Sequence, residues 1–189
     1  AKRVEHNEKL SGEFLERENV VHLFPAAIHQ QQTTVINRHA LAKFGYNPSV
    51  IRYNGKLLMA YRAHVDGGLR CEISMAELNE EFQPKSSHAM KNPVPENGSM
   101  EDPRLFENRG ELFLSYVDHT IDRANLHCRI RVAKLGGENF NDIVSVWTPD
   151  FGKNDGTGLE KNWVFFSNKD RLFAIYSSGP DTQHVLQFD

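Results

Sequence analysis

The strongest constraint on the fold is a pattern that occurs three times along the chain. The copies read "YNPSVIRYNGKLLMAYRAH" from residue 46, "EDPRLFENRGELFLSYVDH" from residue 101 and "KNWVFFSNKDRLFAIYSS" from residue 161. Their common register aligns Asn47 with Asp102 and Asn162, at offsets of 55 and 60 residues. It also aligns two apolar sets, Leu57/Leu112/Leu172 and Tyr61/Tyr116/Tyr176. Repeats of this length are single supersecondary units, so the chain should fold as neighbouring copies of one unit.

Each copy is expected to form a strand, a turn and a second strand. The turns are Asn54-Gly55, Arg109-Gly110 and the triplet 168–170, between alternating apolar and aromatic residues. A third strand is expected at 69–76, 127–133 and 184–188, and a fourth in the second copy at 143–149. Four antiparallel strands repeated every about 40 to 60 residues are typical of a propeller blade. A β-sandwich whose strands resemble one another by accident is the alternative.

The fold class that follows is all-β, of the β-propeller type. Residues 46–189 are expected to form a partial propeller of about three blades, at about 46–98, 99–157 and 158–189. Residues 1–45 do not fit the repeat and form an N-terminal lead-in segment, with a short helix or irregular stretch in "VINRHALAKFGY", that packs against the blades or closes the ring. A composition of 39% hydrophobic and 25% charged residues is enough for one globular domain.

Charge and cysteine usage exclude several function classes. The net charge is −3 and the basic residues are scattered, so neither a nucleic acid nor an anionic membrane is expected as a partner. The first residues lack the apolar core of a signal peptide. The two cysteines, Cys71 and Cys128, are not spaced as a metal or redox pair. A reduced, cytoplasmic protein is therefore expected.

Propeller geometry predicts where a site would form. The innermost strands of the blades begin toward the central channel, so residues at equivalent places surround one cavity. The polar residues expected to converge there are Asn47, Asp102, Arg104, Lys161 and Asn162. Convergent polar groups in a concave pocket are typical of a binding site.

These segments also carry a family resemblance. The stretches "NPSVIRYNGKLLMAYR", "EDPRLF" followed by "LFLSY", and "EKNWVFF" followed by "LFAIYSSGP" resemble glycoside hydrolase family 130, over about residues 46–189. Members of that family are five-bladed β-propellers and include β-mannoside phosphorylases and some hydrolases. The resemblance implies an inverting phosphorolysis of β-mannosidic bonds, with inorganic phosphate as co-substrate, no other cofactor and no metal.

The resemblance also implies a role for each polar residue. Asp102, in the "EDPR" motif, would be the general acid, acting through a sugar hydroxyl, while phosphate replaces the second carboxylate of an inverting glycosidase. Arg104 would hold sugar hydroxyls or phosphate with its planar fork. Glu101 would orient Arg104 or bind a hydroxyl. The remaining expected sugar or phosphate ligands are Asn47, Arg62, Lys161 and Asn162.

Each assignment has an ordinary structural alternative. Asp102 could shape the turn before Pro103, and Arg104 could form an ion pair with Glu101 or Asp118. Arg62 could simply face solvent at a strand end. Trp163 is expected in the core or between blades rather than on a sugar. His64, His119 and His184 lack the ligand spacing of a metal site.

Two other function classes stay open: a glycoside hydrolase or mannosyltransferase on the same scaffold, and a carbohydrate-binding propeller without catalysis. The resembling proteins need roughly 300 residues for five blades, so the 189-residue chain is expected to be a fragment of such a protein. Uncovered blades would expose apolar residues such as Val164, Phe165 and Phe166. A homo-oligomer is the expected consequence.

Overall fold

A computed structural model describes residues 2–4, 45–65, 70–91, 98–122, 125–152, 154, 159–179 and 182–188. Within these ranges the chain forms strands and turns and no helix. The strands make three antiparallel sheets of four strands each. The expected helix in "VINRHALAKFGY" lies outside the described residues, except that Gly45 and Tyr46 begin the first long strand.

Each sheet is a meander in which neighbouring strands follow one another in the sequence. The first contains β2 (Gly45–Tyr53), β3 (Lys56–Val65), β4 (Arg70–Leu78) and β5 (Pro84–Ala89). The second contains β6 (Gly98–Asn108), β7 (Glu111–Asp122), β8 (Asn125–Gly136) and β9 (Asp142–Trp147). The third contains β10 (Val164–Asn168), β11 (Arg171–Gly179), β12 (Thr182–Phe188) and, at its edge, β1 (Lys2–Val4).

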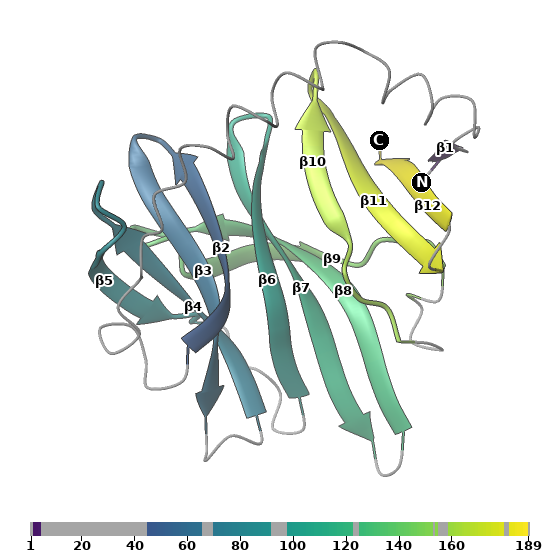
Figure 1. Cartoon of the computed structure of the whole chain (residues 1–189), viewed down its shortest axis with the longest axis horizontal. Helices are drawn as coiled ribbons and strands as arrows, with labels where there is room; N and C mark the ends of the chain where they lie inside the picture. The colour runs from purple at the N-terminus through teal and green to yellow at the C-terminus, as the bar shows by residue number, and fades with distance from the viewer. Residues whose placement is uncertain are drawn as a thin grey trace, which may run out of the picture.

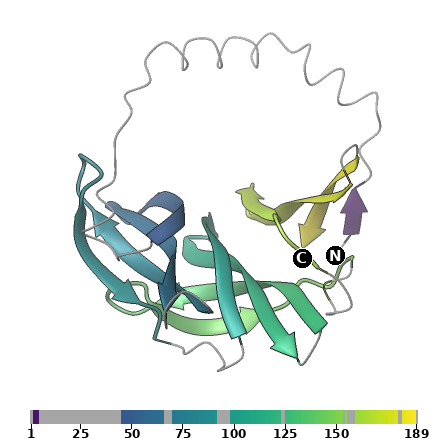
Figure 2. The same cartoon turned by 60° about the horizontal axis from the view of Figure 1, so that its bottom comes forward.

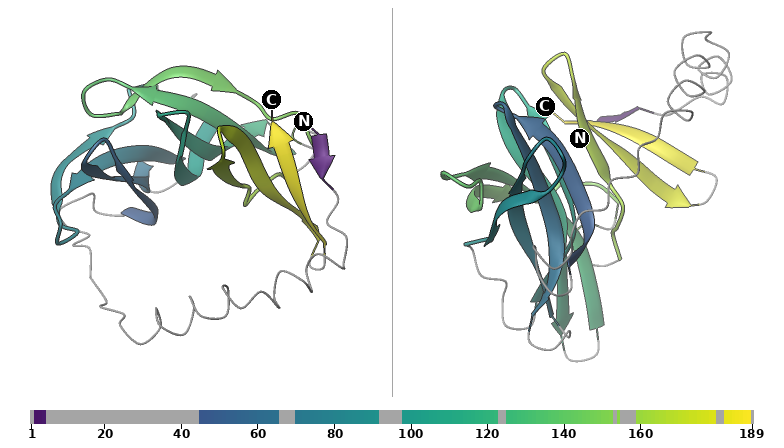
Figure 3. Two further views of the ribbon diagram at one scale, coloured as in Figure 1. Left: turned by 90° about the horizontal axis from the view of Figure 1, so that it is seen from above. Right: turned by 60° about the vertical axis from the view of Figure 1, so that its left-hand side comes forward.

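The sheets are arranged as blades around a common centre. Figure 1 shows β6 between β2 and β10, and Figures 2 and 3 show the three sheets following one another along an arc. This is the expected all-β, propeller-type fold, with three blades in the chain. From the segment before residue 45, β1 pairs with β12 and forms the edge of the third sheet.

Local sequence explains the hairpins that open the blades. Asn54-Gly55 and Arg109-Gly110 join the first two strands of their sheets, and both residues of each pair have positive φ angles, from 48° to 75°. That backbone is the type I′ turn, which matches the twist of a two-strand ribbon and favours glycine at its second residue. In the third blade Lys169 and Asp170 adopt the same left-handed conformation without a glycine, at φ angles of 49° and 60°.

Two apolar layers join the blades. One lies between the first and second sheets and includes Leu58, Ile73, Leu112 and Leu114, all at most 2% exposed. The other lies between the second and third sheets and is rich in aromatic rings; its buried members are Phe106, Val117, Cys128, Ile130, Val132, Trp163, Phe165, Ala174 and Leu186. Burial of this apolar area is the main force that holds blade to blade.

Hydrogen bonds between hairpin turns add to the packing. Tyr53 donates its hydroxyl to the carbonyl of Gly110 at 2.8 Å, and Arg109 donates to the carbonyl of Asp170 at 2.9 Å. Each turn is thereby tied to the turn of the next blade, which sets the spacing of the blades at one end of the sheets.

The expected uncovered face needs one correction. Val164 and Phe166 are 40% and 37% exposed, but Phe165 is only 5% exposed. Successive residues of a strand point to opposite faces, so Phe165 points into the layer against the second sheet while its neighbours point away from it. The uncovered side of the third blade is continued by Ile175, which is 37% exposed and pairs with Val164.

Candidate functional site

Three equivalent residues of the repeat share an unusual backbone. Asn47, Asp102 and Asn162 have φ angles of 49°, 50° and 61°. At Asn47 and Asp102 the strand register also shifts, between Tyr46 and Ser49 and between Glu101 and Arg104. Such bulges turn a side chain out of the ladder, and Asn and Asp tolerate the left-handed region better than other non-glycine residues. Asp102 thus lies at a bulge within β6 and not at its start.

Residues from all three blades meet at one pocket. It has a volume of about 230 Å³ and is lined by Asn47, Pro48, Asp102, Pro103, Arg104 and Asn162. The repeat register therefore predicted correctly that Asn47, Asp102 and Asn162 would surround one cavity. Their roles in binding and catalysis stay predictions.

Asp102 is held in place by the first blade. The side-chain amide of Asn47 donates a hydrogen bond of 2.6 Å to Oδ1 of Asp102. The same oxygen lies 3.6 Å from Nη1 of Arg62. The Asp102 side chain keeps 24% of its surface exposed, so a ligand in the pocket can reach it.

Arg62 and Glu101 lie beneath the pocket rather than in its lining. Nη2 of Arg62 donates to Oε1 of Glu101 at 2.8 Å, and their side chains are only 17% and 10% exposed. The Arg62 guanidinium also sits 4.8 Å from the ring centre of Tyr46, a cation–π geometry. Burial acts to lower the pKa of Arg62. The side-chain hydrogen bond with Cys71 and the charge of Glu101 outweigh burial, so the pKa of Arg62 is raised.

Tyr46 belongs to the same buried cluster. Burial, followed by its hydrogen bond with Cys71, raises the pKa of the Tyr46 hydroxyl to about 12. The ring therefore stays neutral at ordinary pH, with its face available to the Arg62 cation.

The carboxylates that the sequence offered to Arg104 have other partners. Glu101 pairs with Arg62, and Asp118 accepts a hydrogen bond of 3.0 Å from Arg131. Arg104 is exposed and lines the pocket.

Lys161 and Trp163 lie outside the pocket lining. Lys161 is exposed. Burial raises the pKa of the Cys128 thiol, and the positive charge of Lys161 acts against burial by lowering that pKa. Trp163 is 1% exposed and donates its indole N–H to Glu160 at 3.1 Å. Its place in the core between blades is therefore as expected from the sequence.

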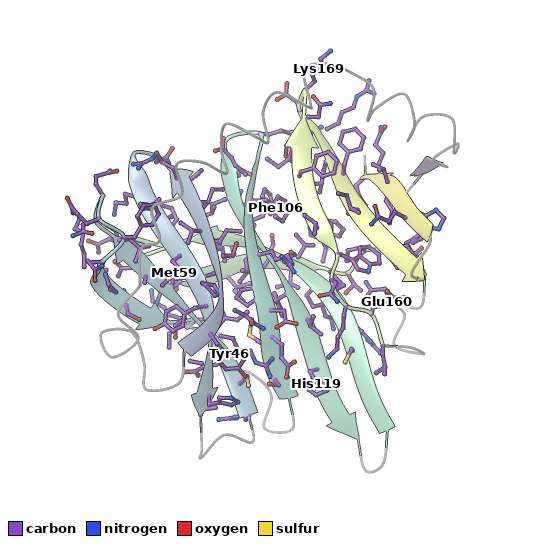
Figure 4. The ribbon with its side chains drawn as sticks, in the orientation of Figure 1. Tyr46, Met59, Phe106, His119, Glu160 and Lys169 are labelled. Atoms are coloured by element: carbon purple, nitrogen blue, oxygen red, sulfur yellow. The ribbon has the colours of Figure 1, made fainter. Side chains whose placement is uncertain are left out.

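Two residues that sequence reasoning did not place in the site approach it closely. Tyr46 supports Arg62, and Nδ1 of His119 lies 3.5 Å from Oε1 of Glu101. Figure 4 shows Tyr46 and His119 toward the same end of the sheets, opposite the hairpin turn at Lys169. The repeat contained the signal: Tyr46 aligns with Glu101, and His119 aligns with His64.

The described residues contain no group of three or more His, Cys, Asp or Glu side chains arranged to hold a metal ion. Over the same residues, no helix has the length and hydropathy needed to cross a bilayer.

Fold and site together define a class of protein: a β-propeller, carried here by three blades, with a polar pocket where its innermost strands converge. No protein-family model matches the sequence, and no curated protein matches it significantly. Among solved structures, the chain is similar to a mannose phosphorylase from Leishmania mexicana in complex with phosphate ion. The identity is 11%, the TM-score is 0.53, and the match covers 90% of this chain and 52% of that one.

An α-L-arabinofuranosidase from Lactobacillus brevis also matches, at 14% identity and a TM-score of 0.49, over 71% of this chain and 45% of that one. The chain thus spans about half the length of these solved structures. At such identities the likeness to the phosphorylase establishes the shared fold.

Proposed function

We propose that this chain is the site-bearing part of a carbohydrate-active enzyme that cleaves β-mannosidic bonds by phosphorolysis. The observation that carries the proposal is the pocket in which three blades present Asn47, Asp102 and Asn162, with Arg104 beside them. Amides and a carboxylate bind sugar hydroxyls through both donors and acceptors. The similar fold of a mannose phosphorylase, and the "EDPR" motif, support this choice of substrate class.

In the proposed reaction, an oxygen of inorganic phosphate bonds to the anomeric carbon while the glycosidic carbon–oxygen bond breaks. The leaving oxygen needs a proton, which Asp102 supplies through a sugar hydroxyl. Because Oδ1 of Asp102 already accepts the Asn47 amide, the proton would be carried on Oδ2. Inversion at the anomeric carbon would release α-mannose 1-phosphate.

The other pocket residues bind rather than react. Arg104 would bind phosphate or hydroxyls by paired N–H groups, and Asn47 and Asn162 would bind hydroxyls from either side. Arg62 and Glu101 would act from beneath by fixing Asp102. Lys161 of the third blade would be a further ligand for sugar or phosphate, although it does not belong to the pocket lining.

A turnover assay and a binding measurement together separate phosphorolysis, hydrolysis and sugar binding without catalysis. Incubation with β-mannobiose should release mannose 1-phosphate and mannose when phosphate is present, and nothing without it. Release of two mannoses irrespective of phosphate would instead indicate a hydrolase. Saturable mannobiose binding by calorimetry without any product would indicate a carbohydrate-binding propeller. If the protein neither binds nor cleaves β-mannobiose, the proposal is refuted.

A further inference from the structure

A chain of charged side chains leads away from the pocket into the interior. Oδ1 of Asp102 lies 3.6 Å from Nη1 of Arg62, and Nη2 of Arg62 donates to Oε1 of Glu101 at 2.8 Å. That same Glu101 oxygen is 3.5 Å from Nδ1 of His119. The three inner side chains are 17%, 10% and 18% exposed. Charges so shielded from water influence one another more strongly than exposed ones.

The internal repeat shows what is special about His119. His64 lies 17 positions after Asn47, and His119 lies 17 positions after Asp102, the equivalent residue of the next copy. Each also lies directly across its strand pair from a cysteine, Cys71 or Cys128. Nδ1 of His64 contacts the Cys71 sulfur at 3.4 Å, whereas Nδ1 of His119 faces Glu101. The equivalent position thus meets a thiol in the first blade and a carboxylate in the second.

Arg62 and His119 compete for one oxygen of Glu101. When the His119 ring is neutral, Arg62 is the stronger partner, at the shorter distance. A protonated ring would attract the carboxylate as a second cation and weaken its hold on Arg62. Nε2 of His119 is buried and has no hydrogen-bond partner among the described residues, so no other hydrogen bond from that nitrogen offsets this competition.

Other charged groups surround the competing pair. Cys128 on β8 lies directly across the strand pair from His119 on β7. The charges of Lys161, Glu101 and Asp118 act on the Cys128 thiol, so they belong to the neighbourhood of this strand pair. Arg62 on β3 and Lys161 oppose a further positive charge here, while Glu101 on β6 and Asp118 on β7 favour it. Asp118 is itself paired with Arg131 on β8.

We propose that His119 is a positioning residue for Asp102. Protonation of His119 decides whether Arg62 pairs mainly with Glu101 or with Asp102. When His119 gains a proton, Glu101 turns toward it, and Arg62 moves toward Asp102. Arg62 then competes with sugar hydroxyls for the carboxylate. The effect on sugar binding rests on the proposed function, whereas the coupling of His119 to Asp102 rests on the geometry alone.

The test follows the side-chain amide of Asn47, which bonds directly to Asp102, by NMR between about pH 5 and pH 8, where histidine titrates. In the wild type its signal should move with the midpoint of the His119 ring. In His119→Gln, which keeps a hydrogen-bonding side chain without the titration, the movement should disappear. The matched control is His64→Gln, in which it should persist.

Glu101→Gln provides a second route, because it removes the charge through which His119 acts and should also abolish the movement. A wild-type Asn47 signal that ignores the His119 titration, or one that still follows it in folded His119→Gln, would overturn the inference. Mannose affinity measured over the same range should weaken several-fold at low pH in the wild type and in His64→Gln only. If no variant binds mannose, the proposed function fails, and the amide signal still decides the role of His119.

Discussion

Asn47 donates a 2.6 Å hydrogen bond to Asp102 across the boundary between the first two blades. The two residues are equivalent in the repeat and share the left-handed backbone, with φ angles of 49° and 50°. One copy of the repeat therefore orients the equivalent side chain of the next. The pocket exists only where two such copies meet, and the third copy adds Asn162 to its lining.

Asp102→Asn should preserve the fold and remove the proton donor. The amide keeps the size of the carboxylate and can still accept the Asn47 bond. General acid catalysis contributes about 10²- to 10⁴-fold, so turnover of unactivated β-mannobiose should fall by at least about 10²-fold. Calorimetry should show a much smaller change in ground-state binding.

Arg104→Lys is the matched comparison for Asp102→Asn. It keeps the charge but loses the planar fork, so binding should weaken together with turnover. If Asp102→Asn turned over at a near-normal rate with phosphate present, "EDPR" would be a bulge and nothing more.

Arg62→Ala should destabilise the protein strongly, because it leaves Glu101 buried without its cation. Loss of one partner of a buried pair costs about 3 kcal/mol. Arg52→Ala is the control: Arg52 and Glu80 are 2.7 Å apart, but their side chains are 53% and 71% exposed. An exposed pair contributes about 0.2–1 kcal/mol. Urea unfolding should show a clearly larger loss in the free energy of unfolding for Arg62→Ala than for Arg52→Ala. Equal losses would show that the Arg62–Glu101 contact contributes no more than a surface pair.

Tyr116 should make the protein less stable in alkali. Burial first, then the charge of Asp118, raises the pKa of this tyrosine to about 12 from its usual 10. Between those values the unfolded chain loses the phenolic proton while the folded protein keeps it, so the free energy of unfolding falls as pH rises. The slope from this residue is at most about 1.4 kcal/mol per pH unit.

Tyr116→Phe should therefore unfold with a shallower pH dependence than the wild type between about pH 10 and pH 12. Below about pH 9 the two curves should run parallel. Chemical unfolding at a series of pH values measures both. A slope unchanged by the substitution would show that Tyr116 titrates alike in the folded and unfolded states.

The uncovered face of the third blade repeats a covered face of the second. Phe106 and Phe113 stack with ring centroids 5.4 Å apart, and Phe166 and Phe173 stack at the same separation. Phe165 of the third blade lies over Phe106, also at 5.4 Å. Phe106 is thereby reduced to 5% exposed, whereas Phe166 remains 37% exposed.

We expect this chain, as it stands, to associate through that face. The sheet faces that carry the three apolar clusters are already buried within one copy. A second copy would therefore contribute the same exposed face of its own third blade. Phe166→Lys should shift sedimenting material toward monomer, because it places a charge in the apolar contact. Val144→Lys, at a residue 61% exposed on β9, should leave association unchanged. Monomeric wild-type protein at all concentrations would contradict the expectation.

The sequence alone determined the repeat, and with it most of the fold. Alternating apolar residues and the turns at Asn54-Gly55 and Arg109-Gly110 encode hairpins locally, and the common register of the three copies made Asn47, Asp102 and Asn162 equivalent. Two of the strands at sheet edges, β1 and β5, were not expected from the sequence. β5 reads "PKSSHA", which is too polar to show a strand pattern, and β1 pairs with a strand at the far end of the chain.

Only the tertiary structure decided which charged groups meet. Glu101 and Arg104 are near neighbours in sequence, yet Glu101 bonds to Arg62 of the preceding blade, whereas Arg104 lines the pocket. The bulge between them changes the strand register and the side-chain directions locally, and the sequence pattern did not show where that bulge lies. His119 approaches the same carboxylate from β7. Such pairings depend on how one blade is rotated against the next, and that rotation is set by the packed apolar layers between blades rather than by any local stretch of sequence.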